Sequence, residues 1–391
     1  MKTGGMQASV ALATMLLVAG CSKFWDVPTN CTVNCPATIS SGVFYVLNSN
    51  AGQVAIAGYS IVKGTLTPLK GGPNVLTAAP LNIAIAPNNS FLYVSTKSGI
   101  YLYTIGAGGA LAPVSTTPIL ADFAAISLQV DATNSWLVEA SGSGYLYALP
   151  ISPLTGSPTG TVLQTPLGGI APRQMTISPD NTYVIVALGQ GGTEVIPFTA
   201  SNANPLPAVA DIPIAVKGVG GAALSVAVDP ANQLLYIGET LGLSGSSNTG
   251  VVRAFIYSSL GGTPTEVTGS PYASGGLTPV SILPAAAGAY VYVANATISN
   301  ISTGTVVGFS KTTTGTSYSL LPLNNTVSAG NTPAALAEDS TGSVVLLVNS
   351  GGSPDLNVYT FDTTTLGKLN PALTSATGTD PVGALAIAAA P

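Results

Sequence analysis

Few residues of this chain could perform acid–base chemistry, because the sequence has no histidine and only three cysteines. A Ser-His-Asp or Cys-His arrangement is therefore excluded, and any proton transfer would fall to a carboxylate. Glu239 follows an apolar strand phrase and is the predicted catalytic residue, as a general base. Asn295 and Asn349 follow equivalent phrases in later repeats. They are predicted ligand-binding residues, and with Glu239 they could supply oxygen ligands to Ca²⁺.

Arg173 and Gln174 stand before another apolar phrase and are also predicted to bind a ligand. The Arg173 guanidinium could hold a carboxylate or phosphate through two parallel hydrogen bonds. The Gln174 amide could orient a substrate but could not take its proton. A structural role is the alternative for all these candidates, since strand-end asparagines usually serve turns and an isolated charge often satisfies backbone groups between blades. Arg253, on an expected strand over 251–256, is expected to point outward.

The candidates are positioned by a repeated hairpin phrase, which is clearest at 172–188. Apolar residues alternate there on both sides of a Pro-Asp-Asn turn, as in a β-hairpin. Asp131, Asp180 and Asp229 lie in such turns. The favoured interpretation is that they are solvated and stabilise the turns. Further copies of the phrase occupy 83–94, 128–138, 226–237, 282–293 and 336–348.

A second family of Gly-led and Thr/Pro-rich phrases follows each hairpin, so each unit of about 45 to 56 residues holds four short strands. Val43–Leu47 matches the second strand of the hairpin phrase but has no first strand before it. Ala384–Ala390 matches the first strand but has no second strand after it. These two half-repeats can pair and close a ring without a bare edge. The sequence therefore predicts an all-β fold, a seven-bladed β-propeller with four antiparallel strands per blade, closed by pairing of its N- and C-terminal strands.

Aligning the repeats groups the polar candidates into two sets at the ends of the inner strands. The first set, at the start of each innermost strand, comprises Asn82, Ser127, Gln174, Ser225, Ser281, Ala335 and Gly383. The second set, after each second strand, comprises Asn48, Thr96, Ala140, Leu188, Glu239, Asn295 and Asn349. One mouth of the channel would thus carry small neutral polar groups together with Arg173.

The N-terminus is predicted to be an export and lipidation signal over 1–20. Lys2, the apolar stretch 10–18 and Val-Ala-Gly before Cys21 are typical of a lipobox, with an ordinary signal peptide as the alternative. Cys21 would be acylated and would anchor the chain to the membrane. Residues 21–41 would then form the acylated cysteine and tether, leaving 42–391 for the propeller.

The tether holds Cys31 and Cys35, which we expect to form a local disulfide in an oxidising compartment. A redox or metal role is the alternative, but two thiols without any histidine cannot complete a tetrahedral zinc site. We accordingly expect no metal centre, and no cofactor other than the Ca²⁺ noted above. Ser22 follows the acylated cysteine, and by resemblance to Gram-negative lipoproteins a serine here implies the outer membrane, facing either the periplasm or the exterior.

Composition limits the partners that the chain could have. Only 6% of residues are charged and the net charge is −5, with few and scattered basic residues, so nucleic acid is not expected. Although 46% of residues are hydrophobic, no apolar run after residue 20 approaches the roughly 20 residues of a spanning helix. We expect a monomer whose partners are the membrane, through Cys21, and a protein, glycan or small anionic ligand.

From about residue 42 to the end, the chain resembles seven-bladed lactonase-type propellers, including 6-phosphogluconolactonases and muconate-cyclising enzymes, and YVTN-repeat surface propellers. The motifs are Pro172-Arg173 followed by I-S-P-D-N, Tyr292-Val293-Ala294-Asn295, and Tyr236-Ile237-Gly238-Glu239. Those enzymes commonly read Pro-Arg-His where this chain reads Pro172-Arg173-Gln174. We therefore favour a non-catalytic, outer-membrane-anchored binding or interaction module, with a sugar-lactone hydrolase, a carboxylic ester hydrolase, as the alternative.

Overall fold

A computed structural model describes residues 42–50, 53–62, 65–168, 170–206, 212–241, 249–296, 303–315, 317–352, 354–375 and 383–390. The predicted signal peptide, the acylation at Cys21 and the disulfide between Cys31 and Cys35 lie outside these residues. In the part described, no helix is long and apolar enough to cross a membrane.

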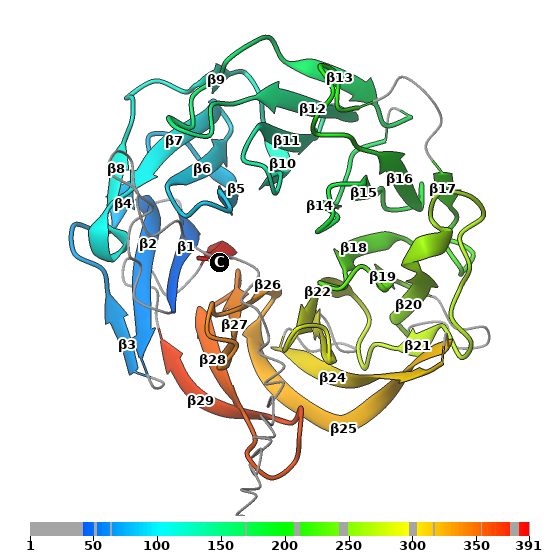
Figure 1. Ribbon diagram of the computed structural model, residues 1–391. Helices are drawn as coiled ribbons and strands as arrows, with labels where there is room; N and C mark the ends of the chain where they lie inside the picture. Colours follow the sequence, from blue (N-terminus) through cyan, green and yellow to red (C-terminus); the bar gives the residue numbers. More distant parts are fainter. Residues whose placement is uncertain are drawn as a thin grey trace, which may run out of the picture. The chain divides into compact units, whose positions relative to one another are not determined.

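The described residues form seven antiparallel sheets set around a ring, which we call blades 1 to 7 (Figure 1). Each sheet has four strands in its main path, so the predicted seven-bladed propeller is confirmed. Two single-turn 3₁₀ helices, η1 (Ala107–Gly109) and η2 (Tyr257–Ser259), interrupt this all-β architecture.

Blades 1 and 2 carry a fifth short strand each, β4 and β9, which pair with β2 and β7. Blade 1 comprises β1 (Val43–Asn50), β2 (Gln53–Val62), β3 (Thr65–Pro68), β4 (Asn74–Val75) and β30 (Ala384–Ala389). Blade 2 comprises β5 (Pro80–Ile85), β6 (Phe91–Thr96), β7 (Gly99–Ile105), β8 (Leu111–Pro113) and β9 (Leu120–Ala121). Blade 3 comprises β10 (Ala125–Val130), β11 (Trp136–Ser141), β12 (Tyr145–Pro150) and β13 (Leu163–Pro166).

The remaining four blades each follow the chain from the innermost to the outermost strand. Blade 4 comprises β14 (Gln174–Ile177), β15 (Tyr183–Ala187), β16 (Thr193–Pro197) and β17 (Ile212–Ile214). Blade 5 comprises β18 (Ala223–Val228), β19 (Leu234–Glu239), β20 (Val251–Ile256) and β21 (Tyr272–Ala273). Blade 6 comprises β22 (Pro279–Ala285), β23 (Tyr290–Asn295), β24 (Thr303–Thr314) and β25 (Ser317–Asn331). Blade 7 comprises β26 (Pro333–Glu338), β27 (Val344–Asn349), β28 (Leu356–Phe361) and β29 (Leu369–Ser375).

The two ends of the propeller meet in blade 1, where β30 is the innermost strand and pairs with β1 (Figure 1). Phe44 stands opposite Ala389 and Val46 opposite Ile387 in antiparallel register. This pairing covers the edge of β1 that would otherwise expose unpaired backbone groups. The predicted closure of the ring is therefore confirmed.

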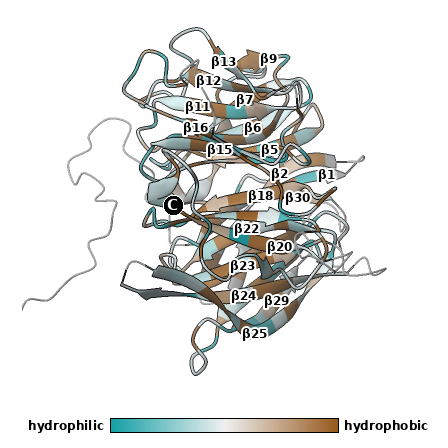
Figure 2. Ribbon diagram, turned by 90° about the vertical axis from the view of Figure 1, so that its right-hand side faces the viewer, coloured by the Kyte–Doolittle hydropathy of each residue, from teal (hydrophilic) through white to brown (hydrophobic). Residues whose placement is uncertain are grey.

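The core lies between blades, because alternate side chains of one strand face opposite neighbours. On β19, Leu235 and Ile237 pack toward blade 4, whereas Leu234 and Tyr236 pack toward blade 6. Every residue of β19 is buried, which explains why the second strand of a blade reads as a nearly continuous apolar run. Figure 2 shows hydrophobic stretches, in brown, along the strands of the successive blades.

The hairpin turns are linked across blades by asparagines in the left-handed backbone region. Asn181 has a φ of 56°, and its side-chain oxygen accepts a hydrogen bond from the Ala132 backbone at 3.1 Å. Its amide nitrogen donates to Asp131 at 3.0 Å. Asn134 likewise accepts from the Asn88 backbone at 3.0 Å. The turn residues thus fix the backbone and also join consecutive blades.

Candidate functional site

The polar residues at the start of the inner strands connect neighbouring blades. The Ser127 hydroxyl donates to the Met175 carbonyl at 3.3 Å and accepts from the Met175 amide at 3.0 Å. Ser225 donates to the Pro279 carbonyl at 2.7 Å, and Ser281 accepts from the Leu336 amide at 3.1 Å. These three side chains satisfy backbone groups of the following blade and are buried. Their alignment in the sequence therefore reflects the assembly of the ring.

Gln174 belongs to the same series of blade-to-blade contacts. Its side-chain oxygen accepts a hydrogen bond from the Val226 backbone of blade 5 at 3.0 Å. Gln174 is only half-buried, so part of the amide stays accessible to solvent. Gln129, two residues after Ser127, makes a similar contact, accepting from the Ile177 amide at 2.8 Å.

Arg173 is exposed beside Gln174, at the boundary of blades 4 and 5. Its side chain lies over Gly189, where a Cβ would stand 3.4 Å from the Arg173 Nε atom. Gly189 exchanges two backbone hydrogen bonds with Ala223, the register partner of Glu239. The structure therefore places Arg173 and Glu239 at the same end of the same blade boundary. None of the ion pairs formed by the described residues includes Arg173.

Glu239 is completely buried and both of its carboxylate oxygens have partners. Oε1 lies 2.8 Å from the Arg253 Nη1 atom, and Oε2 accepts from the Lys217 backbone nitrogen at 2.8 Å. Nη1 of Arg253 also donates to the Ala215 carbonyl at 2.7 Å. Glu239 and Arg253 thereby hold the segment that leads from blade 4 into blade 5. Arg253 is buried, so the expectation that it points outward was wrong.

Glu266 completes this charged cluster, which we define as Lys217, Glu239, Arg253 and Glu266. Arg253 donates from Nε and Nη2 to the two Glu266 oxygens, at 3.1 Å each, in a forked arrangement. Burial alone would raise the pKa of Glu266, but hydrogen bonds from Arg253, Ser270 and Lys217 bring it down to about 2. Burial would lower the pKa of Arg253, yet its bonds to Glu266 and Glu239 raise it. Both groups are therefore held in their charged forms.

Asn295 of blade 6 and Asn349 of blade 7 each bond to the preceding blade or to the segment that leads from it. Asn295 is fully buried, donates to the Ser274 carbonyl at 2.7 Å and accepts from the Ser274 hydroxyl at 2.8 Å. The Asn349 oxygen accepts from the Gly330 amide at 3.2 Å, while its nitrogen donates to Pro354 and Asn357. Their roles as ligand-binding residues stay predictions.

The proposed Ca²⁺ ligands do not form a shared set in this geometry. Glu239, Asn295 and Asn349 lie on β19, β23 and β27 of three different blades. Their oxygens accept hydrogen bonds from three separate places, namely Lys217 after β17, Ser274 after β21 and Gly330 on β25. Within the described residues, no group of three or more His, Cys, Asp and Glu side chains could hold a metal ion. Calcium binding stays a prediction without a defined site.

Three sequence-based expectations need correction. In blade 1 the residue equivalent to Ser127 is Ala386, which pairs with Leu47 as Ser127 pairs with Ala140. The assignment of Gly383 was therefore wrong by three residues. In blade 3 the residue equivalent to Glu239 is Ser141, which pairs with Ala125 as Glu239 pairs with Ala223. The assignment of Ala140 was therefore wrong by one residue.

The turn aspartates do lie in turns, but the expectation that they are solvated was wrong for Asp131 and Asp229, which are completely buried. Asp131, for example, accepts hydrogen bonds from two backbone amides of its own turn, at 2.8 and 2.7 Å.

Glu139 is a buried carboxyl that the repeat alignment did not identify. It lies on β11, is 2% exposed, and neither of its oxygens has a hydrogen-bond partner among the described residues. Burial raises the pKa of Glu139 to about 8. Leu137, on the same face of β11, packs between blades 2 and 3, which places Glu139 at that boundary. Its signal in the sequence is a single carboxylate within the apolar run W-L-V-E-A-S.

Comparison with known proteins gives a likeness of fold. No protein-family model and no curated protein sequence matches this chain. A solved structure of a candidate 6-phosphogluconolactonase from Bacteroides uniformis superposes with a TM-score of 0.65 at 15% identity, covering 86% of this chain and 97% of that one. A second, from Bacteroides fragilis, gives a TM-score of 0.63 at 16% identity and covers 90% and 99% of the two chains.

The periplasmic gluconolactonase of Pseudomonas aeruginosa is also similar, with a TM-score of 0.65 and 19% identity over 90% of this chain and all of that one. At these identities the likeness concerns the propeller fold alone, and a fold of this kind hosts many functions. The side chains of the site must therefore decide between binding and catalysis.

Proposed function

We propose that this chain is a monomeric, lipid-anchored propeller of the outer membrane that binds a small anionic ligand at Arg173 without transforming it. The supporting observation is the contrast between the two charged residues at the boundary of blades 4 and 5. Glu239 is buried with both oxygens occupied, whereas Arg173 is exposed beside the half-buried Gln174. A guanidinium presents paired donors that match a carboxylate or phosphate.

Sugar-lactone hydrolysis is the second candidate, supported by the names of the similar structures. In that reaction water adds to the lactone carbonyl, the ring C–O bond breaks, and a carboxylate and a hydroxyl are formed. A general base must reach the attacking water within about 3 Å. Glu239 could do so only if it left Arg253 and the Lys217 amide, and breaking a buried pair costs several kcal/mol. The geometry therefore supports binding over catalysis.

Binding and hydrolysis can be separated with one panel of full-length proteins in detergent. We expect inorganic phosphate and 6-phosphogluconate to bind wild-type protein, and Arg173→Ala to weaken binding about tenfold or more, since a charge-assisted contact contributes roughly 1.5–3 kcal/mol. Lys97→Ala, which removes another exposed cation, is the matched control. Equal affinities of wild type and Arg173→Ala by calorimetry would refute the role of Arg173.

The same proteins test catalysis with 6-phosphogluconolactone and a pH indicator. We expect no hydrolysis above the buffer rate. Turnover on the order of 1 to 10³ per second that is lost in Arg173→Ala would establish the hydrolase instead.

The membrane anchor is tested independently at Cys21. We expect wild-type protein to partition into detergent and to carry the mass of its acyl chains, and Cys21→Ser to remain in the aqueous phase or unprocessed. Identical partitioning and identical mass of the two proteins would refute lipidation without affecting the ligand proposal.

A further inference from the structure

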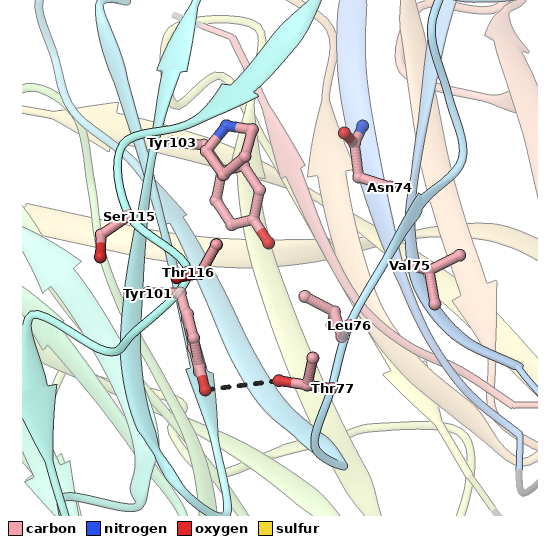
Figure 3. A pocket seen from close by; sticks show the side chains of 9 residues that line it. Asn74, Val75, Leu76, Thr77, Tyr101, Tyr103, Ser115 and Thr116 are labelled. Atoms are coloured by element: carbon pink, nitrogen blue, oxygen red, sulfur yellow. Dashed lines mark hydrogen bonds between the residues drawn. The ribbon is translucent and has the colours of Figure 1, made fainter.

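A groove opens at the boundary of blades 1 and 2, away from Arg173 (Figure 3). Its volume is about 190 Å³. One wall is the segment that begins at β4, with Asn74, Leu76 and Thr77, and the other is β7 and the segment after β8. Tyr101 and Tyr103 of β7 line it together with Ser115, so two blades contribute to one cavity.

The base of the groove is fixed and apolar. Leu76 and Tyr103 are each 6% exposed and both belong to the hydrophobic cluster between blades 1 and 2. Thr77 and Ser115 are exposed and stand at the rim. A rigid apolar base with a polar rim is typical of small-molecule sites.

Hydroxyl groups in and beside the groove form a connected chain. The Tyr101 hydroxyl lies 3.4 Å from the Thr77 hydroxyl, a contact drawn in Figure 3, and 3.2 Å from that of Ser98. Ser98 is in turn 3.1 Å from Thr96, which donates to the Gly99 carbonyl at 2.9 Å. Hydrogen bonds with Ser98 and Thr77 lower the pKa of Tyr101. The Tyr101 hydroxyl is therefore held in place at the exposed side of the groove.

Among the described residues that line the groove, none is an ionisable acid or base apart from the tyrosines. Its polar groups are hydroxyls and one carboxamide, which donate and accept hydrogen bonds but carry no charge. The volume is below the roughly 300–1,000 Å³ of sites for drug-sized ligands, so it suits a single ring. A pyranose has an apolar C–H face that can lie on a tyrosine ring and hydroxyls that can meet a polar rim.

We propose that this groove binds one neutral monosaccharide unit, with its C–H face against Tyr101 and Tyr103 and its hydroxyls bonded to Thr77, Asn74 and Ser115. The proposal does not rest on anion binding at Arg173, which lies in another pair of blades. A failure at either site leaves the other unaffected.

The test uses the full chain in detergent and the methyl pyranosides of glucose, galactose and mannose, followed by saturation-transfer NMR. We expect at least one to bind with a dissociation constant of about 1–10 mM, as is typical of a ligand with few heavy atoms. Glucuronate, which is similar in size but charged, should bind less well because no cation lines the groove. Absence of transfer from all three neutral sugars, or binding of glucuronate alone, would overturn the proposal.

Variants localise the site. Tyr101→Ala should abolish transfer, and Tyr101→Phe, which keeps the ring, should weaken affinity about three- to tenfold because the hydroxyl that positions Thr77 is lost. Tyr147→Phe is the matched control, because Tyr147 occupies the position on β12 that Tyr101 occupies on β7. Transfer that survives unchanged in Tyr101→Ala, or that is equally reduced in Tyr147→Phe, would refute this site.

Discussion

Glu239 in blade 5 and Glu139 in blade 3 are both buried on the second strand of a blade. Both oxygens of Glu239 have partners, whereas those of Glu139 have no hydrogen-bond partner among the residues that the structure describes. The residue opposite Ile237 on the neighbouring strand is Arg253, whereas the residue opposite Glu139 is Tyr147. A cation thus stands next to one carboxylate and an aromatic ring next to the other. Glu239 forms an ion pair with its neighbouring cation, whereas burial raises the pKa of Glu139.

The comparison shows that burial alone does not make a carboxyl chemically available. Both oxygens of Glu239 have partners that replace the water lost on burial. Glu139 lacks such partners, so its neutral form is favoured below a pH of about 8. The same residue type, buried on the second strand of two blades, therefore behaves differently depending on whether a cation lies within reach.

Removal of Arg253 should have the largest effect. Arg253→Met leaves Glu239 buried without its cation and should lower the free energy of unfolding by about 3–5 kcal/mol. Urea denaturation followed by tryptophan fluorescence measures this change. A loss below about 1 kcal/mol would mean that Glu239 is satisfied without Arg253.

The pH dependence of stability should distinguish blade 3. The folded-state pKa of Glu139 is raised to about 8 from 4.5, so the folded protein keeps a proton that the unfolded chain releases. Its contribution to stability is present below pH 4.5 and is lost as pH rises toward 8, by about 3 kcal/mol between about pH 5 and pH 8. Glu139→Gln should remove this slope, as seen in urea midpoints across that range. Parallel profiles of wild type and variant would show that Glu139 is not the titrating group.

The same substitution at the two sites should act in opposite directions at pH 8. Glu239→Gln should cost about 2 kcal/mol, because a charge-assisted hydrogen bond to Arg253 becomes a neutral one. Glu139→Gln should stabilise the protein at this pH, since an amide carries no charge to desolvate. Changes of equal sign in paired unfolding curves would contradict the comparison.

The smallest effect is expected at the exposed end of the charged cluster. Lys217 reaches Glu266 at 3.1 Å, but its side chain is 44% exposed. Lys217→Met keeps the backbone bond to Glu239 and should change stability by about 0.5 kcal/mol or less. A loss comparable to that of Arg253→Met would show that the cluster acts as one unit.

The propeller could be predicted from sequence because alternation and turn residues are local features. The period of two on each arm and the turns at residues such as Asn181 are visible without tertiary contacts. The half-repeats at both ends were also sufficient to predict the pairing of β1 with β30. A single copy of the hairpin phrase would be a weak indication of fold, but its recurrence along the chain made the prediction of a propeller secure.

The site was less predictable, because a side chain's partners belong to other strands and other blades. The Arg253 side chain was expected to point outward, but the strands of this propeller are covered by neighbouring blades on both faces. Gln174 and Ser127 were placed correctly on the inner strands, yet their bonds to the next blade depend on how the sheets stack. Glu139 was missed because its raised pKa follows from burial among described residues that offer it no hydrogen-bond partner, and the sequence does not show which residues surround it.

The closure of the ring also fixes the order in which its edges are covered. During synthesis β1 emerges long before β30, so the inner edge of β1 stays open until β30 has been made. Blades 2 to 7 hold all their strands in sequence and can assemble in the meantime. A chain that lacks β30 would present a bare β edge with which a strand of another chain could pair, so the loss of this one strand would expose the otherwise assembled ring to aggregation.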